Sequence, residues 1–152
     1  MAIFETSFFV PAPLSAVADF HRGTGALKYL TPPPIYVQLH QVESLAEGSR
    51  SEFSLWFGPF SIRWVAVHSQ VDPLHGFTDT QICGPMASWQ HSHRFVAVDG
   101  GTTRVIEHIE YAYPTGWRGL RARLLFNPLS LRLMFAYRAW MTRRRVLASL
   151  MN

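Results

Sequence analysis

The 152-residue sequence contains one cysteine, Cys83, so no disulfide can form within the chain. Structural disulfides are typical of oxidising compartments, and their exclusion here favours a cytoplasmic protein. No neighbouring residue in the sequence would activate the Cys83 thiol. We therefore expect Cys83 to be a buried, unreactive side chain.

Long apolar runs and a basic N-terminal leader are also missing. No run of about 18 apolar residues occurs, so we expect no transmembrane segment. The first ten residues contain Glu5 but neither lysine nor arginine, which is unlike a signal peptide.

Charged residues are scarce, at 16%, and lysine is almost absent, with Lys28 alone against 13 arginines. From Arg118 to the C-terminus the chain contains eight arginines and no acidic residue. Such a segment suits an acidic partner, nucleic acid or an anionic membrane, but a solvated helix face is the favoured interpretation. No known nucleic-acid-binding module is present, so we expect no nucleic acid as partner and interpret Arg143, Arg144 and Arg145 as a solvated helix end.

Apolar residues, by contrast, are plentiful: 48% of the chain is hydrophobic and 14% aromatic. This is enough for a substantial core in a chain the length of one ordinary domain. No repeat, linker or low-complexity segment divides it, and we predict a single domain over residues 1–152.

Alternating polar and apolar residues predict seven strands, and short turn signals between the last six favour an antiparallel meander. The predicted strands are 2–10, 35–43, 50–57, 60–71, 75–83, 86–98 and 102–113. Two short helices, 13–20 and 26–30, follow the first strand. Helical spacing begins near Trp117 and should be kinked or broken at Pro128. The sequence thus predicts an α+β fold in which a sheet curves around a long C-terminal helix.

The segment from Gly76 to Phe95 is the most unusual part of the pattern. Gly84-Pro85 marks a turn between two strands, and the second strand places Trp89, His91, His93 and Phe95 on one face. Two imidazoles between two aromatic rings are too polar for a plain core and too apolar for a solvated face. This mixture favours the wall of a ligand cavity.

These patterns resemble the START/SRPBCC helix-grip superfamily, which includes the birch-pollen-allergen-like fold, and most closely a bacterial subgroup of ligand-binding SRPBCC-domain proteins. The resemblance covers essentially the whole chain and is carried by Leu30-Thr31-Pro32-Pro33, Trp64, Phe77-Thr78-Asp79-Thr80-Gln81, Gly84-Pro85, Trp89-Gln90-His91-Ser92-His93-Arg94-Phe95, Tyr111, Pro114 and Phe135-Ala136-Tyr137-Arg138. Met86 departs from it, because the subgroup usually has Phe after Gly-Pro. The resemblance implies an internal cavity for a small apolar or amphipathic molecule, without implying one chemistry, since relatives include carriers, hormone receptors, aromatase/cyclases and chaperone regulators.

The register of the strands decides which polar groups meet in that cavity. A tight turn at Gly84-Pro85 would bring Asp79 near His91. A three-residue turn after Val98 would place His93 opposite Glu107, whereas a two-residue turn would place Arg94 there. The sequence leaves both registers open. The candidate ligand-binding residues are Trp64, Asp79, Gln81, Trp89, His91, His93, Phe95 and Glu107.

Three interpretations of the cluster of Asp79, His91, His93 and Glu107 remain. It is a set of buried ion pairs, a polar patch that orients a ligand, or a metal or acid–base site. We expect no cofactor or metal. The first functional hypothesis is binding or carriage of a small molecule; a cyclase or dehydratase in the same cavity is the alternative, and a protein-interaction module using the basic segment is the third. The oligomeric state, a homodimer included, stays open.

Overall fold

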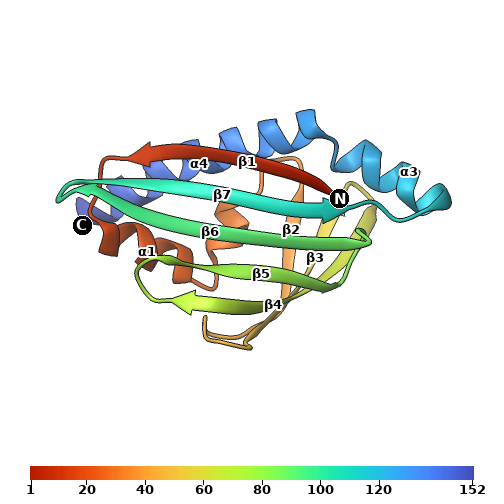
Figure 1. Cartoon of the computed structure of the whole chain (residues 1–152), viewed down its shortest axis with the longest axis horizontal. Coiled ribbons are helices and arrows are strands. Elements are labelled where there is room, and N and C mark those ends of the chain that lie inside the picture. The colour runs from red at the N-terminus through yellow and green to blue at the C-terminus, as the bar shows by residue number, and fades with distance from the viewer.

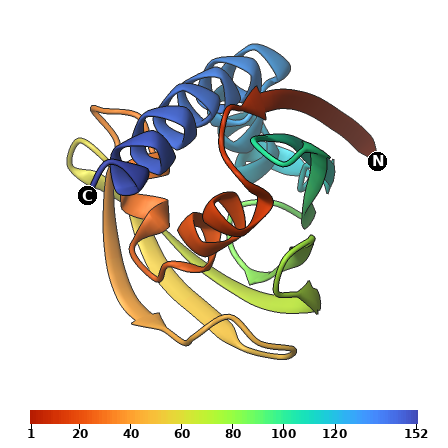
Figure 2. The same ribbon diagram turned by 90° about the vertical axis from the view of Figure 1, so that its left-hand side faces the viewer.

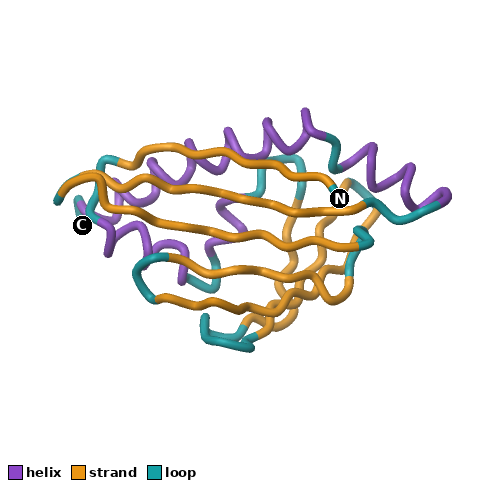
Figure 3. The backbone as a smooth tube through the Cα atoms, in the orientation of Figure 1, coloured by secondary structure: helices purple, strands orange, loops and turns teal.

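The computed structural model describes residues Met1–Asn152 and contains seven strands and four helices (Figure 3). The strands are β1 (Ala2–Val10), β2 (Tyr36–Val42), β3 (Arg50–Phe57), β4 (Phe60–Asp72), β5 (Gly76–Cys83), β6 (Ser88–Asp99) and β7 (Thr102–Ala112). The helices are α1 (Leu14–Arg22), α2 (Ala26–Leu30), α3 (Gly116–Leu125) and α4 (Pro128–Leu150). The predicted α+β class is therefore confirmed.

All seven strands belong to one antiparallel sheet, in the order β1-β7-β6-β5-β4-β3-β2. Figure 1 shows α4 running along the sheet behind β1, and the end-on view of Figure 2 shows the strands curving around it. The short helix α1 lies at the end of the sheet where α4 finishes (Figure 1), and both α1 and α2 contact α4. This arrangement is the helix-grip architecture expected from the sequence.

The C-terminal helical segment is divided at Pro128, as predicted. Asn127 caps α4 by accepting a hydrogen bond from the Ser130 backbone N–H at 2.9 Å, and Pro128 occupies the first turn, where its missing N–H costs nothing. The buried face of α4 then repeats at helical spacing through Leu131, Phe135, Ala139, Thr142 and Val146. This face packs toward the concave side of the sheet.

The β6–β7 register places His93 opposite Glu107. Only Gly100 and Gly101 separate the paired residues Asp99 and Thr102, so the turn alone would have placed Arg94 opposite Glu107. A bulge between Ala97 and Asp99 shifts the pairing by one residue. The register that directs Glu107 inward therefore depends on this bulge.

The two larger buried apolar clusters lie between the sheet and α4. One includes Trp89 and Phe135, and the other includes Phe95 and Val146. Along β6, His91 and His93 lie between Trp89 and Phe95, all on the same buried face. The two imidazoles therefore lie where the apolar clusters meet.

Two expectations about the periphery had different outcomes. Cys83 is exposed, so its predicted burial is wrong. It is the last residue of β5 and lies beyond Thr80, the last β5 residue that pairs with β6. Arg143, Arg144 and Arg145 are exposed as expected, although Arg143 Nε also donates to the Phe9 carbonyl at 2.8 Å. None of the helices has the length and apolar character needed to cross a membrane.

Candidate functional site

A cavity of about 570 Å³ lies between the concave face of the sheet and α4. It is bounded by residues from α1, α2, strands β2 to β6, α3 and α4, and 21 of its 36 lining residues are hydrophobic. Small-molecule sites are typically concave, mostly apolar and of about 300–1,000 Å³. The cavity therefore has the size and character of a site for one small molecule.

Five of the eight candidate residues line this cavity: Trp64, Asp79, Trp89, His91 and His93. The other three, Gln81, Phe95 and Glu107, do not line it. The Gln81 side chain instead closes the β5–β6 turn, with Nε2 donating to the Met86 carbonyl at 3.0 Å and Oε1 accepting from the Met86 N–H at 3.3 Å. Phe95 and Glu107 are each 2% exposed, and Glu107 lies behind the two histidines. A direct role in ligand binding stays a prediction for all eight.

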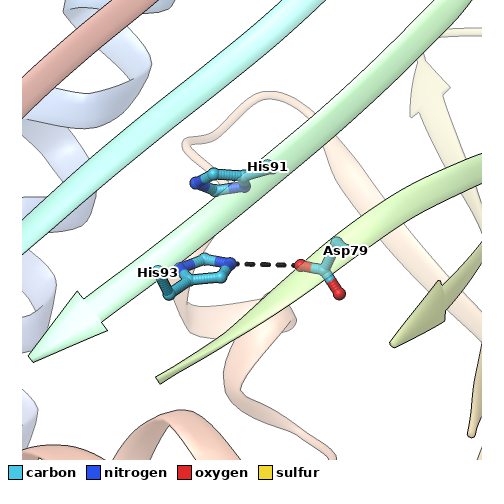
Figure 4. A group of neighbouring side chains, drawn as sticks. All are labelled: Asp79, His91 and His93. Carbon is cyan, nitrogen blue, oxygen red and sulfur yellow. Dashed lines mark hydrogen bonds and ion pairs between the residues drawn. The ribbon is translucent and has the colours of Figure 1, made fainter. Parts of the chain in front are cut away.

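Polar side chains in and directly behind the cavity wall form a continuous series of histidine–carboxylate contacts, which we call the polar chain. Asp79 bridges two histidines: Oδ1 is 2.9 Å from His68 Nε2, and Oδ2 is 3.1 Å from His93 Nε2. Figure 4 shows the second of these contacts, with the His91 ring beside that of His93. Glu107 bridges the next pair, because its Oε2 is 2.8 Å from both His91 Nε2 and His93 Nδ1. The order of the chain is His68, Asp79, His93, Glu107, His91.

The charges of the histidines and carboxylates in the polar chain depend on two opposing effects, burial and ion pairing. Burial opposes protonation of His93, but the charge of Glu107 and the hydrogen bond to Asp79 raise the pKa of His93 to about 9. For His91, burial and the neighbouring charge of His93 prevail and lower the pKa to about 4. Burial would raise the pKa of both carboxyl groups, but their histidine partners lower it for Asp79 and Glu107. At neutral pH an imidazolium therefore lies between two carboxylates, and His91 is neutral.

Three further polar residues line the cavity but were not among the candidate site residues: His21, His68 and Arg138. The sequence contained a signal for each. His68 shares the period-two face of Trp64 on β4, and His21 follows the buried Val17 by four residues on α1. Arg138 follows Leu131 and Phe135 by seven and three residues on α4, which places it on the same helix face.

Asp79, His91 and His93 also present ligand atoms within 4.8 Å of one another, a spacing compatible with a metal ion. However, His93 Nε2 already contacts Asp79, and His91 Nε2 contacts Glu107. A metal ion would have to displace these charge-assisted contacts. The geometry therefore favours a paired network over a metal centre.

No family model and no curated protein matches this sequence. Solved structures do. An aromatase/cyclase, Zhui, from Streptomyces sp. R1128 is 13% identical, with a TM-score of 0.78 over 98% of this chain and 95% of that one. Norcoclaurine synthase from Thalictrum flavum is 15% identical, with a TM-score of 0.71 over 97% and 95% of the two chains. At these identities the likeness establishes the fold.

A third solved structure is closer in sequence but much longer. The nucleoside-diphosphate sugar epimerase from Corynebacterium glutamicum is 33% identical, with a TM-score of 0.68 over 93% of this chain. This chain spans only 28% of that protein. The similarity therefore concerns one part of the larger protein.

Proposed function

We propose that this chain, which has the helix-grip fold of the START/SRPBCC superfamily, binds a small apolar or amphipathic molecule in the cavity between its sheet and α4. The observation that carries the proposal is a largely apolar cavity of about 570 Å³ with one polar wall. Trp64, Trp89 and Phe126 supply apolar contact area, and the polar chain around His93 supplies orientation. The epimerase activity of the longer relative is not transferred, because this chain spans 28% of that protein.

Catalysis of a cyclisation or dehydration in the same cavity is the second candidate. It is favoured by imidazoles with carboxylate partners in the cavity wall, an arrangement used for proton transfer. It is also favoured by fold neighbours described as an aromatase/cyclase and a norcoclaurine synthase. Binding ranks first because His93 already contacts carboxylates through both nitrogens, and the low pKa of His91 makes it a weak base at neutral pH.

A substitution that fills the cavity with a larger side chain tests this proposal. Ala66 is buried and lines the cavity on β4, so Ala66→Phe should occlude it, whereas Ala136→Phe adds the same ring on the exposed face of α4. We expect the wild type to bind the dye anilinonaphthalene sulfonate at micromolar concentrations, about −8 kcal/mol. Affinity should fall about 10-fold or more in Ala66→Phe and stay unchanged in Ala136→Phe.

Melting temperatures establish that both variants are folded before affinities are compared. Equal dye affinity in the wild type and in a folded Ala66→Phe variant would show that binding occurs elsewhere. Native mass spectrometry of freshly purified protein then identifies any molecule retained from the cell. A bound mass that is lost in Ala66→Phe would support the proposal directly.

A further inference from the structure

Arg138 is a cation of the cavity wall that has no anionic partner. It lies on the cavity side of α4, with its Cζ 5.0 Å from the centre of the Phe135 ring. The side chain is half-buried, its Nε is buried without a hydrogen-bond partner, and the guanidinium forms no ion pair. Arg22, the other arginine that lines the cavity, is paired with Asp19. Arg138 therefore presents hydrogen-bond donors whose acceptors are not supplied by the protein.

The nearby carboxylates do not satisfy this side chain. Asp79 and Glu107 influence the pKa of Arg138 through their charge, but neither lies within ion-pair distance of it. Both oxygens of Asp79 and Oε2 of Glu107 already contact histidines of the polar chain. Burial of an unpaired charge is unfavourable, and a guanidinium has five donors and no acceptor. A group that enters the cavity with negative charge would satisfy it.

Resting on the proposed function, we propose that Arg138 binds the carboxylate of an amphipathic ligand whose apolar part fills the rest of the cavity. A carboxylate matches the planar fork of a guanidinium with two parallel hydrogen bonds. The apolar part would contact side chains such as Leu125, Phe126 and Met134, which line the cavity from α3, the α3–α4 connection and α4. A phosphate dianion fits less well, because Asp79 and Glu107 would repel its second charge.

Three probes of equal chain length separate charge from hydrophobicity: dodecanoate, methyl dodecanoate and dodecyl phosphate, each below its micellar concentration at pH 8. Charge-assisted hydrogen bonds are stronger than neutral ones. We therefore expect the wild type to bind dodecanoate about 10-fold or more tightly than the methyl ester, and more tightly than the phosphate. Titration calorimetry measures all three affinities.

Variants at two arginines of α4 locate the effect. Arg138→Gln should bind dodecanoate and its ester equally, with ester affinity close to that of the wild type. Arg138→Lys, which retains the charge without the planar fork, should keep part of the preference and serves as a second variant if Arg138→Gln does not fold. Arg132→Gln, on the exposed face of the same helix, should behave as the wild type.

The outcomes distinguish failure of the carboxylate-binding proposal from failure of the proposed binding function. If the wild type binds dodecanoate and its ester equally well, the assignment of an anionic ligand fails while binding in the cavity stands. If dodecyl phosphate binds most tightly, the carboxylate assignment is wrong. If Arg138→Gln keeps the preference for dodecanoate, Arg138 is not the anion-binding residue. If no probe binds, the proposed binding function fails as well.

Discussion

His93 shows how charge is accommodated in a cavity wall through pairing with two carboxylates. Its two nitrogens contact Asp79 and Glu107, and each carboxylate contacts a further histidine. Because buried ions are stable only when they are paired and hydrogen-bonded, the chain of contacts keeps both carboxylates ionised in an apolar setting. The same pairing leaves the neighbouring Arg138 without an anion.

Glu107→Gln tests the origin of the His93 charge. The charge of Glu107 is the largest contribution that raises the pKa of His93, and glutamine preserves the shape while removing that charge. We expect the pKa of His93 to fall from about 9 toward the ordinary 6.5, measured by NMR titration of its ring protons. Glu110→Gln, a more exposed position on β7, should leave it in place. A pKa of His93 that stays near 9 in Glu107→Gln would contradict the assigned cause.

For individual residues, the sequence predicted which strand faces point inward but not which side chains contact one another. Period-two alternation correctly placed His91, His93 and Glu107 on buried faces. It could not show that Asp79 contacts His68, because β4 and β5 pair through two register shifts. Nor could spacing along α4 show that Arg138 lacks an acceptor, because that depends on where the carboxylates of the sheet lie in the folded protein.

The β5–β6 hairpin depends on a close approach of two backbones at Gly76. Gly76 has φ of +131°, and a Cβ built there would lie 1.9 Å from the His93 carbonyl oxygen. Both the backbone conformation and the contact exclude any side chain. The hairpin that carries the polar chain therefore requires glycine where β5 begins.

Gly76→Ala should consequently lower the free energy of unfolding by about 2 kcal/mol or more, because the β5 backbone must move away from His93. Gly100→Ala is the matched control, since a Cβ at Gly100 meets nothing within 4 Å. Its effect should stay within about 0.5 kcal/mol. Urea denaturation measures both, and equal stability of the two variants would show that the hairpin tolerates a side chain at Gly76.

Elements were easier to predict than their junctions. The alternating segments located all seven strands, and Pro128 correctly located the division between α3 and α4. The bulge near Val98 could not be predicted, because Asp99-Gly100-Gly101 permits turns of two or three residues. That single-residue difference decides whether His93 or Arg94 lies opposite Glu107. Local patterns therefore predict the strands, whereas the contents of the cavity wall depend on pairing across the sheet.

For the molecule as a whole, the buried histidines make stability depend on pH in two opposite directions. His93 has a folded pKa of about 9, above the ordinary 6.5, so its contribution is fully present below pH 6.5 and is lost as pH rises through 9. His21 and His91 have pKa values lowered to about 4, chiefly by burial. Between pH 4 and 6.5 the unfolded chain binds protons at these two residues that the folded chain does not, so stability falls as pH decreases.

These opposing effects predict a maximum of thermal stability near pH 6.5, and the raised pKa values of His68 and His108 add to the decline on the alkaline side. Two histidines act on the acidic limb, and the lowered pKa values of Asp79 and Glu107 add to the loss at still lower pH. Each unit of pKa difference corresponds to about 1.4 kcal/mol, so the free energy of unfolding should fall by several kcal/mol on the acidic side of the maximum. His91→Phe removes one of the two histidines. Stability should then fall less as the pH decreases, while its fall at alkaline pH should be unchanged. Melting temperatures from pH 4.5 to 9.5 test this, and a wild-type curve that rises steadily to pH 9 would show that His93 is not charged in the folded protein.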